Sequence, residues 1–385
     1  MHFYESSIIT TKDGLHCQVY GNEHPGEHII VKPKYIPTDR IASNSLSFRF
    51  ISGNKMNRLN MWIDKQELKQ YIEDFKKHYP NHIFQSPIHN KDRLFFSVHI
   101  DDIEKIYFPR RGLSELMSMP RESLDEHLIT VYGFVKFLMK SGLSQKDLGL
   151  TYSTLMGHYL SKISDINIVV YGKQNYWKLM KYLETASHPL LQWKTAEQWI
   201  EFYNKRNRFA IFDKNQFVKD MLKKKSEGFF NSTLFVIFAA EKEDEVWFKW
   251  GQETYHDIGT AEIEAIVQDN TSSVVRPGCY DVEDSIITNF EHNEKLAIDN
   301  MKLKKVVFHS RDYCMLAKKG DRIKAKGLLE KVVPKQGNPY LRLVIGYFDA
   351  YISDRREQDF IKVIMTNHEQ SKKLAIDKIT EQSCW

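Results

Sequence analysis

Two residues with oxygen-bearing side chains, Asp165 and Asn167, stand two positions apart in the otherwise apolar stretch SDINIVVYG. Side chains two positions apart on a β-strand point to the same face, so these two would lie side by side. A carboxylate and an amide oxygen in that arrangement can share a divalent cation. The small-residue segment TYSTLMG, with Ser153 and Gly157, comes directly before them. The spacing therefore suggests metal-assisted chemistry.

The composition limits the class of protein that can carry such a site. Of the 385 residues, 42% are hydrophobic and 13% aromatic, enough for more than one core and for two or three domains. The longest wholly apolar run, residues 234–240, is too short to cross a bilayer, and the opening MHFYESS does not resemble a signal peptide. We therefore expect a folded cytoplasmic protein with no membrane partner.

The charge balance bears on a nucleic-acid partner, and the cysteine spacing bears on zinc sites and disulfides. The chain has 55 Lys and Arg against 50 Asp and Glu, and this net charge of +5 permits a nucleic-acid partner without indicating one. The cysteines are far apart and form no CxxC pair, which argues against a zinc site and a disulfide scaffold. We expect reduced thiols at all four positions: Cys17, Cys279, Cys314 and Cys384.

The pattern along the chain divides it into successive parts. In residues 1–115, a hairpin is predicted around GNEHPGE, followed by a helix in DKQELKQYIEDFKKHY whose apolar stripe contains Leu68 and Phe75. In residues 120–250, helices alternate with strands, which is typical of an α/β domain. A helix in SLDEHLITVYGFVKFLMKSGL ends near Gly142, another opens with a capping box at Thr195, and STLFVIFAAE is a buried strand.

The rest of the chain has a different pattern. A helix is predicted from Asp213 to Gly228, and short strands separated by Gly, Pro and Asn turns fill residues 255–350. This second pattern is typical of a small β-barrel. Residues 351–385 form a tail of strand or helix. The fold class is thus a multidomain α+β and α/β protein.

The order of helix, TYSTLMG, spacer, SDINIVVYG and helix resembles the core motif of the DNA polymerase beta superfamily of nucleotidyltransferases. The flanking stretches HPGEHIIVKPKYIP, KKKSEGFF and GDRIKAKGLLEKV are similar to an archaeal group of predicted nucleotidyltransferases, so the resemblance covers most of the chain. It implies an N-terminal α+β domain, a polymerase-beta-like core and a C-terminal barrel of the oligonucleotide-binding (OB) type.

The resemblance also implies a function and its residues. Members transfer a nucleotidyl group from a nucleoside triphosphate to a nucleic-acid or protein acceptor, and two Mg²⁺ ions stabilise the attacking and leaving oxygens. Asp165 and Asn167 match the catalytic metal-binding pair, and Glu241 is the candidate third ligand. The resemblance assigns triphosphate contacts to Ser153 and Gly157. Independently of it, the basic runs offer Lys223, Lys224, Arg206 and Arg208 as candidates for further phosphate contacts.

Two positions depart from the family pattern, and they leave the function open. The family glycine is Tyr152 here, and the second carboxylate is Asn167, which lacks a negative charge. One alternative is therefore a catalytically inactive homologue that acts as a nucleic-acid-binding or scaffold protein. Another is an RNA-binding module that uses the basic helix ends together with lysines and tyrosines of the barrel: Lys324, Lys326, Lys331, Tyr340 and Tyr347.

Several of these residues also have a purely structural interpretation. Ser153 is either a phosphate ligand or a helix N-cap, and Lys223 to Lys225 suit the C-terminal end of a helix without any ligand. His24 and His28 flank Pro25 and Gly26, which predicts a turn and not a metal pair. The aromatic residues near position 200 fit one buried helical face: Trp193, Trp199, Phe202 and Tyr203.

Overall fold

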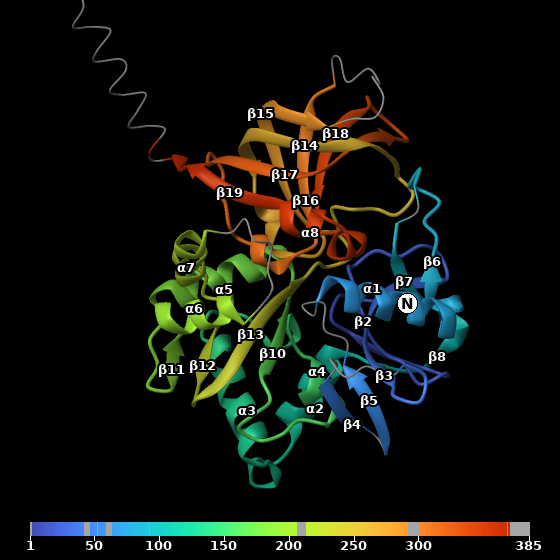
Figure 1. The fold of residues 1–385 in the computed structure, drawn as a ribbon. Coiled ribbons are helices and arrows are strands. Elements are labelled where there is room, and N and C mark those ends of the chain that lie inside the picture. The colour runs from blue at the N-terminus through green and yellow to red at the C-terminus, as the bar shows by residue number, and fades with distance from the viewer. Residues whose placement is uncertain are drawn as a thin grey trace, which may run out of the picture.

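The protein is a mixed α+β structure in which successive stretches of the chain form separate sheets (Figure 1). The computed structural model describes residues 2–41, 47–51, 53–58, 64–91, 93–205, 213–291, 301–367 and 369. Within these ranges, each sheet has its own cluster of buried apolar side chains. No helix there is long and apolar enough to cross a membrane.

The N-terminal part is an antiparallel sheet covered by one long helix. Helix α1 (Lys65–His78) buries Leu68, Tyr71, Ile72 and Phe75 against the sheet, as its apolar stripe predicts. Strand β3 (His28–Pro37) is the centre of the sheet, because it pairs with β2, β5 and β7. The other strands are β1 (Ile8–Thr11), β2 (His16–Val19), β4 (Ser47–Ile51), β5 (Asn54–Arg58), β6 (Ile83–Phe84), β7 (Phe95–His99) and β8 (Ile103–Tyr107).

The middle part is a mixed sheet with the order β11-β12-β13-β10-β9. Strand β10 (Ile166–Tyr171) lies inside it, parallel to β13 (Thr233–Ala240) and antiparallel to β9 (Leu148–Leu150). The face with Ile166, Ile168 and Val170 packs against helices α3 and α5. The remaining elements are α2 (Pro109–Ser118), α3 (Glu126–Met139), α4 (Tyr152–Met156), α5 (Lys173–Thr185), β11 (Leu191–Trp193), α6 (Ala196–Asn204), α7 (Lys214–Lys223) and β12 (Glu227–Phe230).

The C-terminal part is a sheet of long, bent strands at the top of Figure 1. Three of them were expected to be short but run for 13 to 17 residues, because register shifts let β14 and β17 bend while they stay paired. The elements are β14 (Glu253–Asp269), β15 (Gly278–Glu291), β16 (Leu303–Phe308), β17 (Arg322–Pro334), β18 (Tyr340–Ile345), α8 (Arg355–Gln358) and β19 (Phe360–Met365). The predicted tail, residues 351–385, therefore contains both a short helix, α8, and a strand, β19.

The two ends of helix α7 show where local sequence signals are sufficient to predict a helix boundary and where they are not. Asp213 caps α7 as predicted, accepting hydrogen bonds from the backbone of Asn215 and Gln216. The helix ends at Lys223, however, and not at Gly228 as expected, because residues 227–230 pair with β13 as strand β12. Sheet pairing therefore overrides the helical pattern there.

The capping box of α6 provides a first testable prediction. The Thr195 hydroxyl accepts from the Gln198 backbone N–H at 3.3 Å, and the Gln198 side chain accepts from the Thr195 N–H at 3.0 Å. Replacing Thr195 with Ala should lower the free energy of unfolding by about 1 kcal/mol, measured by urea denaturation. Glu201→Ala, on the exposed side of the same helix, is the control, and an equal loss there would contradict a capping role.

Candidate functional site: a cationic pocket

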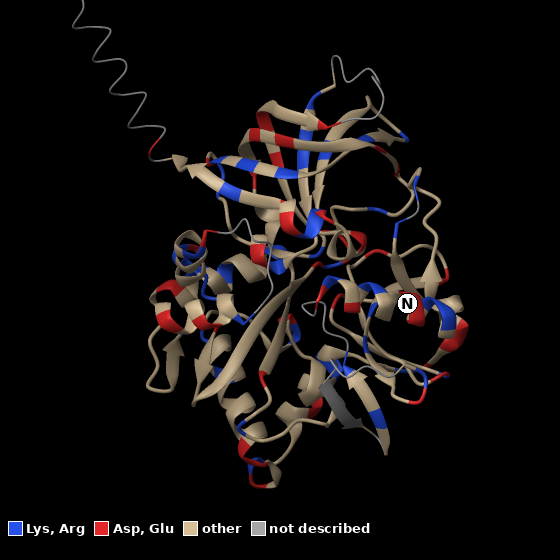
Figure 2. Cartoon of the chain, viewed as in Figure 1, with Lys and Arg blue, Asp and Glu red and all other residues tan. Residues whose placement is uncertain are grey.

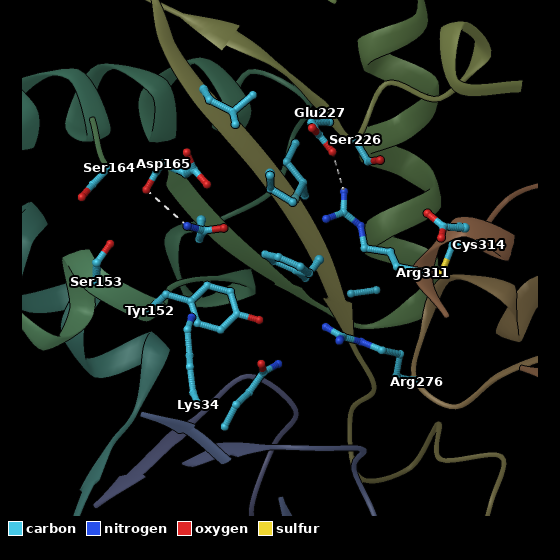
Figure 3. A pocket seen from close by; sticks show the side chains of 18 of the residues that line it. Lys34, Tyr152, Ser153, Ser164, Asp165, Ser226, Glu227, Arg276, Arg311 and Cys314 are labelled. Carbon is cyan, nitrogen blue, oxygen red and sulfur yellow. Dashed lines mark hydrogen bonds and ion pairs between the residues drawn. The ribbon is translucent and has the colours of Figure 1, made fainter. Parts of the chain in front are cut away.

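A large cavity lies where the three parts of the chain meet (Figure 3). Its volume is about 530 Å³, within the range of small-molecule binding sites. Strand β3 and Arg58 supply one wall, the sheet around β10 and β13 supplies another, and residues 274–276 and 311–315 close it. Asp165, Asn167 and Ser153 all line it, as the sequence predicts for one shared cleft.

The pocket has a strong excess of positive charge. Of its described lining residues, seven are Lys or Arg and three are Asp or Glu. The cations are Lys32, Lys34, Arg58, Lys194, Lys224, Arg276 and Arg311, and the acids are Asp165, Glu227 and Asp312. Such a concentration of one sign in a concave site attracts anions and raises their local concentration.

Lys34 reaches the pocket through an irregularity in its strand. On β2, His16 pairs with Tyr35 and the next residue, Cys17, pairs with Pro33, so Lys34 is an extra residue in the ladder. Such a bulge turns a side chain away from its regular direction. The Lys34 amine lies 3.3 Å from the centre of the Tyr152 ring (Figure 3). The bulge therefore aims a lysine from the N-terminal sheet at the middle sheet.

The electrostatics around Lys34 disfavour its charged form. Burial lowers its pKa well below the ordinary value, and Arg58 and Lys32 lower it further, while Asp165 acts in the opposite direction. Within the described ranges, its amine forms no hydrogen bond or ion pair with an acidic group. A cation in this setting gains stability when an anion binds beside it.

Tyr152 also has an unusual backbone conformation. Its φ is +57°, in the left-handed region that non-glycine residues rarely adopt. Its ring forms an edge contact with Phe238 at 5.5 Å between centroids, and burial raises the pKa of its hydroxyl. The position where the resemblance places a glycine therefore keeps a backbone that suits glycine, although it carries a side chain that fills part of the pocket.

Asp165, Asn167 and Ser153 come together around the start of β10. Asn167 pairs with Val236 on β13, which pairs with Glu227 on β12, so the three form a row across the sheet. The Asn167 side-chain nitrogen donates to the backbone carbonyl of Asp165 at 3.2 Å. Burial raises the pKa of Asp165, and Glu227 adds to that effect. Ser153 is the second residue of α4, and Thr151, not Ser153, is the N-cap.

Glu227 is an acidic pocket residue that the sequence analysis did not single out. Lys194 donates to its carboxylate, and Arg311 forms an ion pair with it at 3.5 Å (Figure 3). The Lys194 amine also lies 4.4 Å from the centre of the Trp199 ring. These contacts hold Lys194 and Arg311 at the pocket wall in fixed positions.

Arg276 joins the pocket to the buried interior of the N-terminal part. Its guanidinium forms an ion pair at 3.0 Å with Glu5, whose side chain is fully buried. Burial opposes the charged form of Arg276, but the Glu5 carboxylate raises its pKa above the ordinary value. The ion pair therefore keeps one cation charged at a place shared by two parts of the chain.

Several predicted site residues lie elsewhere. Glu241 follows the far end of β13, about 20 Å along the strands from Asp165, and pairs with Lys173 at 3.0 Å. It is therefore not a third ligand beside Asp165. Gly157 is the exposed C-cap of α4, with φ +76°, and it does not line the pocket. Lys223 is exposed and pairs with Asp220, 3.8 Å away.

Lys224, in contrast, lines the same pocket as Asp165. Its amine donates to the Asp312 carbonyl oxygen at 2.6 Å, and burial lowers its pKa to about 8. Arg206 and Arg208 lie outside the described residues. Trp193 is on strand β11 and not on the helical face predicted for it, while Trp199 is buried beside Phe217 in a small cluster.

The tyrosines proposed for base stacking on the C-terminal strands are not available for it. Tyr340 and Tyr347 are 6% and 5% exposed, and their hydroxyls bond to Glu253 and Arg342. Lys324 and Lys326 pair with Glu262 and Glu291 at 2.6 and 3.8 Å. Figure 2 shows these basic positions of β17 beside acidic positions of neighbouring strands. The charges of Lys324 and Lys326 are therefore partly balanced by acidic neighbours.

The donor set around Asp165 does not fit a pair of magnesium ions. Asp165 is the single carboxylate of the expected pair, and its raised pKa favours the neutral form. Lys34, Arg58 and Lys194 act on it electrostatically and would repel a divalent cation. The described part of the chain contains no group of three His, Cys, Asp or Glu placed to hold a metal ion.

Comparison with known proteins found one relative with a similar sequence. The uncharacterized protein MJ1086 of Methanocaldococcus jannaschii is 25% identical over 360 residues, which cover 91% of this chain and 98% of that protein. No protein-family model matches the chain. No solved structure matches it either.

Proposed function

We propose that this protein binds the phosphate groups of a nucleoside triphosphate, or of a nucleic-acid chain, in the cationic pocket. The observation that carries the proposal is the charge of the pocket lining, which contains seven basic and three acidic residues. One of the basic residues, Lys34, has no acidic partner among the described residues. Phosphate oxygens are strong acceptors for Lys and Arg donors. Such an anion would offset the cost of holding these cations together in a partly buried site.

The proposal places the protein among nucleotidyltransferase-like proteins. Support comes from the order β9, α4, β10, which brings Ser153, Asp165 and Asn167 to one pocket. We also propose that the C-terminal strands form a small barrel of the OB type. Strand β14 pairs with both β15 and β17, and the ladders β15–β16, β16–β18 and β18–β17 complete a circuit.

Calorimetric titration of the full chain with each nucleoside triphosphate tests phosphate binding. We expect heat of binding in the presence of a chelator, since the pocket cations and not a metal supply the charge. Affinity should fall steeply as salt is raised, because bound phosphates displace counterions. Absence of binding by triphosphates and by single-stranded RNA or DNA at low salt would reject the proposal.

A second candidate function is the Mg²⁺-dependent nucleotidyl transfer that the resemblance implies, and Asn167→Asp tests whether its site can be restored. A second carboxylate beside Asp165 should tighten nucleotide binding in Mg²⁺ on the order of tenfold, because an anionic ligand attracts a divalent cation. Without Mg²⁺ the same change should weaken binding. Calorimetry with and without Mg²⁺ measures both effects.

The matched control for this variant is Asn289→Asp, at an exposed position of β15. If Asn167→Asp gives no Mg²⁺ response, the double variant with Tyr152→Gly follows, because glycine adopts the φ of +57° at position 152 without strain and opens the pocket. Failure of the folded double variant to respond to Mg²⁺ would reject metal-dependent transfer and leave phosphate binding standing.

A further inference from the structure

Two backbone irregularities from different parts of the chain meet at a single amine. Lys34 is the bulged residue of β3, and Tyr152, whose ring lies under the amine, has a left-handed backbone. Conformations of this kind cost free energy and gather at functional sites, where the surrounding structure maintains them. The bulge and the left-handed residue thus meet inside the pocket, where the amine lies over the ring.

The surroundings of the amine match those of a lysine nucleophile. A lysine attacks as the neutral amine, and enzymes obtain that form by placing it in a desolvated site beside other cations. Four charged groups act on the Lys34 amine, and they come from different parts of the chain. They are Lys32 on β3, Arg58 on β5, Asp165 just before β10 and Arg276 just before β15. Three of these four are basic and favour the neutral amine.

Resting on the proposed function, we propose that Lys34 is the nucleophile of a nucleotidyl-transfer reaction and forms a covalent lysine–nucleotide intermediate. The lone pair of the neutral amine attacks the α-phosphorus of a bound nucleoside triphosphate and forms a P–N bond. The bond from the α-phosphorus to the bridging oxygen breaks, and pyrophosphate leaves with its electron pair. One amine proton passes to water.

The other cations of the pocket supply the electrostatic part of the step. Arg58, Arg276 and Arg311 line the same cavity as Lys34 and offer donors to the triphosphate oxygens. Ion pairs with Glu5 and Glu227 hold Arg276 and Arg311 in place. Guanidinium groups placed where charge develops stabilise a phosphoryl-transfer transition state. This arrangement also accounts for a nucleotidyltransferase-like pocket that keeps one carboxylate of the expected metal-binding pair and has seven basic lining residues. An acceptor would then attack the phosphorus and release Lys34.

The test is intact-mass spectrometry of the full chain after incubation with each nucleoside triphosphate, with and without Mg²⁺. Without an acceptor the reaction stops after the first step, so we expect the mass of one nucleoside monophosphate per chain. A P–N bond is stable in base and labile in acid, and peptide mapping should place the nucleotide on Lys34. Formation of the adduct should rise with pH as the amine loses its proton.

Lys34→Arg separates a covalent role from phosphate binding. Arginine stays protonated and cannot act as a neutral nucleophile, but it still donates hydrogen bonds to phosphate oxygens. This variant should therefore bind nucleotide within about threefold of the wild type yet form no adduct. Lys69→Arg, on the exposed face of α1, should form the adduct normally.

The outcomes separate this inference from the proposed function. Nucleotide binding without an adduct, or an adduct that persists in Lys34→Arg, overturns the inference and leaves the proposed function intact. Absence of nucleotide binding by the wild type overturns the inference, and it rejects the proposed function as well when single-stranded RNA and DNA also fail to bind.

Discussion

Replacing Lys34 with methionine should stabilise the unliganded protein and at the same time remove most of its affinity for phosphate. Methionine keeps the length and apolar stem of lysine but removes a charge that has no acidic partner among the described residues. We expect a gain on the order of 1 kcal/mol in the free energy of unfolding. Nucleotide affinity should fall by about 10- to 150-fold, the value of a hydrogen bond to a charged group.

The stability gain of this variant should depend on pH. Because the folded-state pKa of Lys34 lies below its unfolded-state value, the unfolded chain binds the proton more readily in the interval between them. Wild-type stability therefore falls as the pH is lowered through that interval. The advantage of Lys34→Met should be largest below the folded-state pKa and absent above the unfolded-state value.

Urea denaturation and calorimetry of the same preparations measure the two effects. Lys69→Met is the control, since substitution of an exposed lysine should change stability by less than about 0.5 kcal/mol. If Lys34→Met is less stable than the wild type and binds nucleotide equally well, Lys34 is a structural residue and not a phosphate contact.

Replacing Arg276 with methionine should cause the largest loss of stability that we predict. The change leaves the fully buried Glu5 without its ion-pair partner at 3.0 Å, and an uncompensated buried charge costs roughly 3–5 kcal/mol. Hydrogen bonds from Gly21 and Gln18 to the Glu5 carboxylate remain and would offset part of that cost. Urea denaturation at neutral pH measures the change.

The pH dependence and a double variant identify the cause of this loss. Burial already raises the pKa of Glu5 in the wild type, and Arg276 opposes that effect. In Arg276→Met, Glu5 should therefore hold its proton still more tightly in the folded state, so stability should fall more steeply than in the wild type as the pH rises above the ordinary carboxyl pKa. Adding Glu5→Gln should recover at least half of the loss, because it removes the unpaired charge. An additive double variant would mean that the two residues do not interact.

The elements that the sequence predicted correctly depend on local signals. The apolar stripe of α1, the capping box at Thr195 and the cap at Asp213 are each specified within a few residues, and the structure contains all three. The predicted end of α7 was wrong, because the pairing of β12 with β13 decides where the helix stops. That pairing also places Glu227 in a row with Asn167, which no local pattern reveals.

The site was only partly predictable for the same reason. Asp165, Asn167 and Ser153 are close in sequence, and their shared cleft follows from strand geometry. Lys34 enters the pocket through a bulge, and Arg276 and Arg311 come from segments more than 100 residues after Asp165. The two lysines of VKPKY were a usable signal, since a basic pair around a proline in a strand is unusual, but their destination depends on the fold of the whole chain.

The way in which the pocket is assembled has a consequence for dissecting this protein. Strand β3, strand β10 and the segments around Arg276 and Arg311 each contribute a wall, so no single part contains a complete binding surface. A fragment that folds by itself should therefore bind phosphate poorly. In the intact chain the ligand acts as a tether between the parts, and its binding free energy adds to the free energy that keeps them together. Saturating nucleotide should slow proteolytic cleavage in the connections between the parts, far from the pocket itself.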